Sequence, residues 1–414
     1  DLSSFHARTG GGLINGAHTR SIRELDADIC ESDRAMKPVL VVGAGFAGAV
    51  YARELAEAGV PVVVIDRRPS VGGNAHDCTN TDGLLIHKYG PHLFHTNMAK
   101  VVAWVSRFCE LDEYRHRVQA LLPNGKFVPL PVNITTVSEV YGRTFASTVE
   151  LDAFMATVRI EFDEPRNAAE YLYSQIGKSL TDLFFRPYTR KMWNEELEDV
   201  HPSVVRRLQI RTDEQDLYFP NDKYQFLPRG GYTALFQSIF DHPNIVLSLN
   251  TGFSRELERD FDQVFNSMPI DEYFEFSLGE LPYRSIRFHH RQEIGDAPKI
   301  AVTNFTDEGP FTRETTWNAL PGNQASGRLA ITKEEPCDYR DNNLERYYPV
   351  RTADNRHVAL YHRYKELADR DPKMAFIGRC GTYQYLDMDQ VINQSLQNVR
   401  IWLSNTTKSR FHSL

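Results

Sequence analysis

The chain has 414 residues, of which 41% are hydrophobic and 25% charged, a composition typical of a globular protein with two or three domains. Its net charge of −8 and its dispersed Lys and Arg residues give no broad positive field, which excludes nucleic acid as an expected partner. The five cysteines are widely spaced and form no CxxC pair, so neither a disulfide framework nor a zinc site is expected. With no apolar run of membrane-spanning length, the sequence predicts a soluble protein of the reducing cytoplasm.

The first half of the chain changes from a polar segment to an α/β pattern and then to helices. Residues 1–36 are weakly periodic and are expected to form a flexible extension outside the fold. Residues 37–112 follow the pattern strand, glycine turn, helix, strand. Residues 134–212 are predicted to be helical. Pro165 and Asn167 are start signals for a helix within this region, whose apolar stripe consists of Leu172, Ile176, Leu180 and Leu183.

The second half returns to strands. The patterns at 244–250 and 262–268 are expected to rejoin the first sheet, whereas residues 284–332 alternate like an antiparallel sheet. Near the C-terminus a strand ends at Gly378 and a helix follows, which repeats the opening pattern in reverse order. The chain is therefore expected to leave its first sheet and come back to it.

A glycine motif lies between the run VLVV and the first helix. Gly43 permits a tight turn, Gly45 lets backbone N–H groups approach a pyrophosphate, and Gly48 allows close packing of helix on strand. Asp66 ends the next apolar run, where its carboxylate can bind ribose hydroxyls. Strand, helix, second strand and terminal acid agree, so the motif predicts a dinucleotide site at the helix N-terminus.

The residues after the acid indicate which dinucleotide is bound. The segment DRRPSVGGN, residues 66–74, resembles the acid-x5-GG signature of FAD-binding proteins. No second GxGxxG is present for a nicotinamide cofactor, so NAD(P)H is expected only as an external and occasional reductant of the flavin.

The segment HKYGPHLFHTN, residues 87–97, contains two histidines three residues apart, His92 and His95. A metal pair is one interpretation, but no third ligand with suitable spacing is evident. A buried loop that packs on the cofactor is the favoured interpretation, and no metal is expected.

Further motifs follow in order: FFRPYTRKMW (184–193), YFPNDKYQFLPRGGYTALF (218–236), FTRETTW (311–317), YYPV (347–350) and IGRCGTYQYLDM (377–388). Together with YGPHLFHTN they resemble the bacterial type of UDP-galactopyranose mutase, from Lys37 onward. The resemblance implies a Rossmann-like FAD domain (37–113, 233–279 and 370–410), an inserted helical bundle (134–212), and a six-stranded antiparallel sheet (114–133, 213–232 and 280–369), in a homo-oligomer.

The same resemblance implies roles for single residues toward a UDP-sugar. Tyr188 and Trp193 match aromatic residues that hold the uridine, and Arg207 and Arg313 match the two arginines that bind the diphosphate, with Arg206 and Arg211 as competitors for the first role. The other expected substrate contacts are Tyr218, Phe219, Arg284, Tyr347 and Tyr385, with Tyr348 as an alternative to Tyr347.

The cofactor contacts implied by the resemblance come from both ends of the chain. His92 is expected against the flavin ring, and Arg379 near its redox-active part. The full set is Gly43, Gly45, Phe46, Ala47, Gly48, Asp66, Arg67, Gly73, Asn74, His92, Leu93, Arg379, Tyr385, Leu386, Asp387 and Met388. Arg207, Arg313 and His92 are the residues expected to take part in catalysis.

The implied reaction is the interconversion of UDP-galactopyranose and UDP-galactofuranose, in which N5 of reduced FAD forms a covalent adduct with the anomeric carbon. Asn266, Ser267, Met268 and His116 depart from the usual family residues, which leaves the preferred sugar open. A mutase for another nucleotide sugar and a flavin oxidoreductase of the amine-oxidase type are the alternatives.

Overall fold

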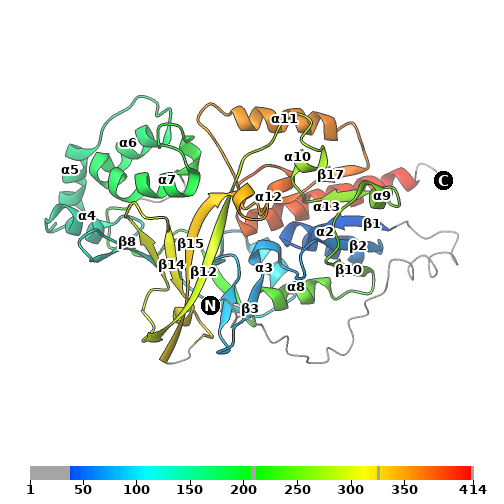
Figure 1. Ribbon diagram of the computed structural model, residues 1–414, viewed down its shortest axis with the longest axis horizontal. Helices are drawn as coiled ribbons and strands as arrows, with labels where there is room; N and C mark the ends of the chain where they lie inside the picture. The colour runs from blue at the N-terminus through cyan, green and yellow to red at the C-terminus, as the bar shows by residue number, and fades with distance from the viewer. Residues whose placement is uncertain (1–37, 207–210, 324–326, 412–414) are drawn as a thin grey trace.

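A parallel sheet forms one end of the protein (Figure 1). The computed structural model describes residues 38–206, 211–323 and 327–411, with side chains up to Thr406, so the predicted extension 1–36 lies outside the described residues. The sheet has five parallel strands in the order β10 (Ile245–Leu249), β2 (Val62–Asp66), β1 (Val39–Val42), β11 (Val264–Asn266) and β17 (Met374–Phe376). The return of β10 and β11 to the first sheet is confirmed.

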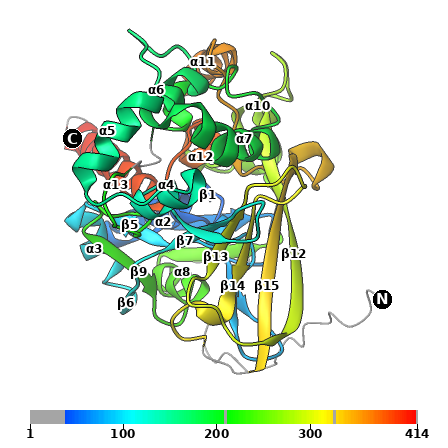
Figure 2. The ribbon, with the colours of Figure 1, turned by 90° about the vertical axis from the view of Figure 1, so that its left-hand side faces the viewer.

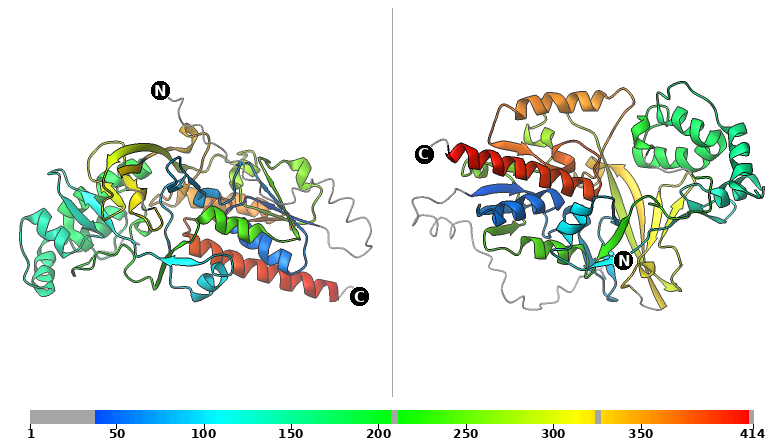
Figure 3. Two further views of the ribbon diagram at one scale, coloured as in Figure 1. Left: turned by 90° about the horizontal axis from the view of Figure 1, so that it is seen from below. Right: turned by 180° about the vertical axis from the view of Figure 1, so that it is seen from behind.

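Alternate residues of β1 enter two different cores because successive side chains of a strand point to opposite faces. Val39 and Val41 pack with the helices on one face, and Leu40 and Val42 belong to the core on the other. The first face is covered by α2 (Phe46–Glu57), α3 (Ala99–Val105), α8 (Tyr232–Phe240) and α13 (Met388–Phe411). The right-hand view of Figure 3, seen from behind, shows α13 in red lying across the sheet. Beyond the other face lie α9 (Arg255–Glu258), α10 (Ile270–Tyr273) and α11 (Arg356–Ala368).

The second sheet is larger than the six strands that the resemblance implied. In the described part of the chain it has seven, in the order β16 (Tyr348–Pro349), β12 (Tyr283–Gly295), β15 (Gly327–Asp338), β14 (Arg313–Thr316), β13 (Val302–Phe305), β7 (Val118–Leu121) and β8 (Phe127–Leu130). One pair, β7 with β13, is parallel. The long stretch of chain between these two strands makes this possible, since parallel neighbours need a long crossover connection.

A third sheet has three strands and lies apart from the other two. β9 (Tyr224–Pro228) falls within the range 213–232 assigned to the antiparallel sheet, but it pairs with β5 (Phe94–Thr96) and β6 (Leu111–Glu113). The phenylalanines Phe94 and Phe226 stack with ring centroids 4.6 Å apart, so burial of aromatic side chains favours this pairing. A hairpin of β3 (Asp77–Thr79) and β4 (Leu85–His87) lies nearby in the chain.

The helical region stands above the second sheet (Figure 2). It comprises α4 (Ile134–Tyr141), α5 (Thr148–Val158), α6 (Ala168–Leu180), a π-helical turn (Thr181–Phe185) and α7 (Arg186–Trp193). Asn167 caps α6 as predicted, because its Oδ1 accepts a hydrogen bond from the N–H of Glu170 at 2.9 Å. The predicted stripe is buried at Leu172, Ile176 and Leu180 and partly buried at Leu183. Among the described residues, no helix combines the length and the hydropathy of a membrane span.

Candidate functional site

The glycine loop between β1 and α2 is shaped by close backbone contacts. Gly43 has φ of 103°, and a Cβ placed on it would lie 2.0 Å from Ser267 Oγ. A Cβ on Gly48 would lie 1.9 Å from the Gly43 carbonyl oxygen, so the helix can approach the strand only without a side chain there. Gly45 caps α2 without a side-chain hydrogen bond, and Phe46 and Ala47 form the first helical turn. The helix N-terminus is thus shaped for an anionic group.

Asp66 and the second glycine pair close this cradle. The Asp66 carboxylate accepts hydrogen bonds from the N–H groups of Ala44 at 2.7 Å and Arg68 at 2.8 Å. A Cβ on Gly73 would lie 3.1 Å from the Cα of Gly45, so the two glycine loops lie back to back. Next to them, the Asn74 Oδ1 accepts a hydrogen bond from Arg68 at 3.0 Å.

Arg67 extends away from the cradle: half of its side chain is exposed and its guanidinium is 3.9 Å from Glu345. The side chain of Arg68 is turned inward instead. The two adjacent arginines therefore have different surroundings.

Two of the three histidines in the 87–97 segment, His92 and His95, have different partners. His92 Nδ1 lies 2.8 Å from the Gly90 carbonyl oxygen, whereas His95 Nδ1 lies 2.7 Å from the Asp222 carboxylate. Burial lowers the pKa of His92 to about 4, so its imidazole is neutral near pH 7. Leu93 packs against the cores on both sides of the segment. Within the described ranges, no three His, Cys, Asp or Glu side chains are grouped for a metal ion.

Arg379 connects the cofactor side of the site with the aromatic residues. It lies in α12 (Gly378–Gly381), where a Cβ on Gly378 would be 3.0 Å from Ala47 Cβ, so α12 touches the first turn of α2. The Arg379 guanidinium donates to the carbonyl of Leu386 at 2.5 Å and to that of Tyr347 at 3.1 Å. The predicted residues Asp387 and Met388 follow directly, at the start of α13.

Aromatic rings from three distant segments form one wall of the site. The Trp193 ring, in α7, has its centroid 6.3 Å from Tyr348 and 6.4 Å from Tyr385. Tyr348 and Tyr385 stack at 5.4 Å, and Tyr188 packs in the same cluster. The guanidinium carbon of Arg379 lies 5.4 Å from the Tyr348 ring centroid and 5.1 Å from that of Tyr385. The wall therefore combines apolar faces with a cation.

The two candidate tyrosines at 347 and 348 face different neighbours. The Tyr347 ring lies against Tyr89 at 5.9 Å and Phe288 at 6.0 Å. Tyr348 lies in the wall instead, with Tyr385 and Trp193. The geometry favours Tyr348 as the tyrosine that faces a ligand at the wall.

Arg313 begins β14 and is held by a buried carboxylate. Its Nε donates to Glu334 Oε2 at 2.7 Å, and the Glu334 side chain is only 1% exposed. Burial raises the pKa of Glu334, and the adjacent guanidinium opposes that rise. The Arg313 charge also lowers the pKa values of Tyr188 and Tyr348, against the larger effect of their burial, so both phenols lie near this cation.

The second oxygen of Glu334 lies close to the turn that precedes His92. Gly90 has φ of 80°, and a Cβ on it would be 2.8 Å from Glu334 Oε1. Within the described residues this oxygen has no hydrogen-bond partner. Glu334 was not among the residues predicted for the site. Its only signal is a glutamate in the alternating strand GRLAITKEEPC, residues 327–337.

His116 and Tyr218 complete the side of the site next to β9. The N–H of Tyr218 donates to the His116 carbonyl at 2.8 Å, and the Tyr218 ring meets Phe219 edge-to-face at 4.9 Å. His116 is 5% exposed, and burial lowers its pKa to about 3, with the Arg313 charge contributing. Its Nδ1 has no partner within the described residues.

Two predicted arginines are not placed in the wall. Arg284 donates from Nε to the Met192 carbonyl at 2.7 Å and from Nη2 to the Lys191 carbonyl at 3.2 Å, at the end of α7. Arg207 lies outside the described residues. Its competitors have partners elsewhere, since Arg206 lies 5.5 Å from the Tyr171 ring centroid and Arg211 pairs with Asp213 at 2.7 Å.

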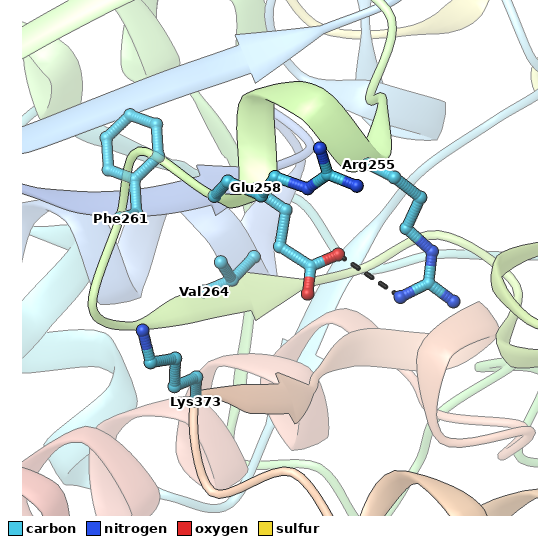
Figure 4. A pocket seen from close by; sticks show the side chains of 6 residues that line it. Arg255, Glu258, Phe261, Val264 and Lys373 are labelled. Carbon is cyan, nitrogen blue, oxygen red and sulfur yellow. Dashed lines mark hydrogen bonds and ion pairs between the residues drawn. The ribbon is translucent and has the colours of Figure 1, made fainter.

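A separate pocket lies at the opposite end of the parallel sheet from the glycine loop (Figure 4). Val264, at the start of β11, and Lys373, just before β17, contribute to its lining. Two of its charged side chains, Arg255 and Glu258, pair with each other at 3.3 Å. The pocket contains none of the predicted site residues.

The residues present fit a dinucleotide and an anionic ligand side by side. The cradle supplies glycine loops that would clash if they carried a Cβ, a helix N-terminus and the Asp66 carboxylate. The neighbouring wall supplies aromatic faces together with Arg313 and Arg379. This combination can bind a base and a diphosphate next to the dinucleotide.

Comparisons with known sequences agree with this geometry. The family described as UDP-galactopyranose mutase matches residues 183–385, and the NAD(P)-binding Rossmann-like domain matches residues 41–108. A probable UDP-galactopyranose mutase of Klebsiella pneumoniae is 36% identical over 89% of this chain and 95% of its own length. A dTDP-fucopyranose mutase of Escherichia coli is 32% identical over 89% of this chain and 99% of its own length.

Solved structures share the fold. The crystal structure of a reduced UDP-galactopyranose mutase has a TM-score of 0.69 at 17% identity, covering 89% of this chain and 96% of that one. A putative protoporphyrinogen oxidase from Exiguobacterium has a TM-score of 0.62 at 14% identity, covering 88% of this chain and 98% of that one. Because sequence relatives above 30% identity extend over nearly their whole length, the chain belongs to the UDP-galactopyranose mutase family.

Proposed function

We propose that this chain interconverts UDP-galactopyranose and UDP-galactofuranose, with FAD bound in the glycine cradle. The observation that carries the proposal is the Arg313 guanidinium, held by Glu334 beside the aromatic wall. A fixed cation next to stacking faces suits a ligand that has both a diphosphate and a base. The family membership supports the same reaction.

The aromatic residues and the arginine divide the work on the substrate. Tyr188 and Trp193 hold the base, and Arg313 neutralises the diphosphate, which leaves the sugar and later returns to it. Glu334 fixes the direction of the guanidinium because its Oε2 accepts from Nε. We include Arg207 as a second diphosphate cation, by its match to the family motif. This positioning matters because the diphosphate must stay bound while the sugar ring opens and recloses.

On the cofactor side of the site, Asp66, Gly45 and Gly73 would hold FAD, and Arg379 and His92 are the residues proposed for its flavin ring. When bound and reduced, the flavin supplies an electron-rich N5 as a nucleophile for the anomeric carbon. The neutral His92 adds no positive charge there. We also propose that NAD(P)H reduces the flavin as an external reductant. The reaction leaves the oxidation state of the sugar unchanged, so the substrate does not supply these electrons.

The experiment that tests this function compares the purified holoprotein in its oxidised and dithionite-reduced forms. UDP-galactofuranose is added, and the products are separated by chromatography. We expect UDP-galactopyranose from the reduced form only. Turnover by the oxidised form alone would contradict the proposal, and an oxidised sugar product would instead identify a flavin oxidoreductase.

A second candidate is the same ring contraction on another nucleotide sugar. The similarity to the dTDP-fucopyranose mutase covers 99% of that relative, and His116 and Asn266 depart from the usual family residues. Measuring kcat/KM for UDP-galactofuranose and dTDP-fucofuranose on the same preparation separates the two candidates. A higher value for the dTDP sugar would favour the second.

A further inference from the structure

Lys191 ties the substrate-binding helix α7 to the second sheet. Its side chain is only 7% exposed. The ammonium donates to the carbonyl of Phe311 at 2.9 Å and to that of Phe305 at 3.2 Å, and it pairs with the Asp307 carboxylate at 3.1 Å. Phe305 ends β13, and Asp307 and Phe311 lie on the turn that leads from β13 to Arg313, the first residue of β14. Lys191 therefore connects the helix that carries Tyr188 and Trp193 with the strand that carries the diphosphate cation.

A second contact ties the same helix end to the sheet in the reverse direction. Arg284, in β12, donates to the carbonyls of Met192 and Lys191. The last carbonyls of a helix lack intrahelical partners and carry partial negative charge, so a cation there is favourable. In the last turn of α7, Lys191 therefore donates hydrogen bonds to the sheet region, and the helix carbonyls accept hydrogen bonds from Arg284 of the sheet.

The surroundings of Lys191 are those of a structural clamp. A buried ammonium is costly unless its three donors are satisfied, and three acceptors are present here. Asp307 is 66% exposed, so the two backbone carbonyls supply the more sheltered contacts. The preceding residue, Arg190, is exposed and pairs with Glu196 at 2.8 Å. It also reaches Glu308, on the same turn as Asp307, at 3.5 Å, but both side chains are exposed and such a pair contributes little. Arg190 is therefore a neighbouring cation whose contact with the turn is solvent-exposed.

We propose that Lys191 is a positioning residue that fixes the separation between the base subsite on α7 and the diphosphate cation Arg313. This inference rests on the proposed function. A ligand with a base and a diphosphate gains affinity from two subsites only when their spacing matches the ligand. UDP spans both subsites, whereas uridine occupies only the one on α7. Loosening the clamp weakens UDP binding and leaves uridine binding nearly unchanged.

The test uses the full-length holoprotein with Lys191→Met and, as the matched control, Arg190→Met. UDP affinity is measured by titration calorimetry, and uridine affinity by ligand-observed NMR. For Lys191→Met we expect the Kd of UDP to rise about tenfold or more and that of uridine to change less than about twofold, since the loss falls on the linkage of two subsites. The KM of the UDP-sugar rises with the Kd of UDP. Arg190→Met leaves both affinities unchanged.

Two outcomes overturn the inference. An equal loss of UDP and uridine affinity in Lys191→Met means that the residue only supports the fold of α7, and unchanged UDP affinity means that no clamp exists. Should Lys191→Met fail to fold in a thermal melt, Lys191→Gln, which keeps donors for the carbonyls, provides the same comparison with a smaller expected loss. If the unmodified protein binds no UDP, the proposed function fails instead, so the two failures are distinguishable.

Discussion

The glycine cradle is shaped mainly by backbone atoms that are close in the sequence, whereas the aromatic wall is formed by side chains from distant elements. Gly43, Gly45, Gly48 and Gly73 lie within one short stretch, and a Cβ on Gly48 or Gly73 would meet backbone atoms of that same stretch. The wall instead joins α7, β14, β15, β16 and the segment after α12, and its contacts are side chain to side chain. A backbone cradle is local in sequence, so a motif can reveal it. A wall of side chains exists only after the chain has folded.

The largest expected effect comes from the wall. Arg313→Ala removes the diphosphate cation and leaves the buried Glu334 carboxylate unpaired. We expect kcat/KM to fall by about a thousandfold, the scale for a fixed charge-stabilising group, and the free energy of unfolding to fall by about 3–5 kcal/mol, the scale for a broken buried pair. Mutase assays and urea unfolding measure the two losses separately.

A double variant separates charge burial from function. Arg313→Met with Glu334→Met removes both charges, so most of the lost stability should return while activity stays low. Recovery of turnover in this double variant would show that Arg313 does not bind the diphosphate.

The next effect tests the cradle. Gly48→Ala places a Cβ 1.9 Å from the Gly43 carbonyl oxygen, so α2 must move away from β1. We expect a cost of about 3 kcal/mol, typical of severe overpacking, and loss of most of the bound flavin, seen as reduced visible absorbance per protein. Gly252→Ala is the control, because nothing lies within 4 Å of its Cβ. Full flavin content in Gly48→Ala would contradict the role assigned to close packing.

The stability of the region between cradle and wall should depend on pH. Burial lowers the pKa of His87 and His116 to about 3 and that of His92 to about 4. In the unfolded chain these groups take up protons below about pH 6.5. The unfolded state thus binds more protons as pH falls from about 6.5 toward 4, and stability is lost in that window.

One substitution isolates the contribution of a single histidine. In urea unfolding between pH 7 and 5, His116→Asn should reduce the slope of stability against pH by up to about 1.4 kcal/mol per pH unit, the effect of one proton. An unchanged slope would mean that His116 is protonated alike in both states.

The smallest effect distinguishes two neighbouring tyrosines. Tyr348 lies in the wall near Arg313, whereas Tyr347 packs against Tyr89 and Phe288. Tyr348→Phe should lower kcat/KM by about tenfold, the scale of one lost hydrogen bond to a charged group. Tyr347→Phe should stay within about threefold of the unmodified enzyme. The reverse order would favour Tyr347 as the substrate contact.

Much of the parallel sheet could be predicted from the sequence. The glycine motif, Asp66 and the apolar runs gave β1, α2 and β2, and the strands at 245–249 and 264–266 joined them as expected. These patterns are local and depend on backbone geometry. By contrast, no strand was predicted at β9, because its pairing with β5 depends on contacts such as Phe94 with Phe226, far apart in the chain.

The wall could be found only through its resemblance to a family, and even then in part. Periodicity treats a lysine or a glutamate as a surface residue, yet Lys191 and Glu334 are both buried. Each is stable inside only because a partner lies more than 20 residues away, at Arg313 for Glu334 and at Phe311 for Lys191. Such pairs leave no signal in a single sequence.

The close approach of Gly90 to Glu334 limits how this protein can diversify. Any side chain at residue 90 would meet Glu334 Oε1 at 2.8 Å and push the carboxylate away from Arg313. In a randomised library, active clones should therefore keep glycine at 90 unless the acid at 334 is shortened at the same time. The turn at Gly90 and the acid that holds Arg313 would then have to vary together.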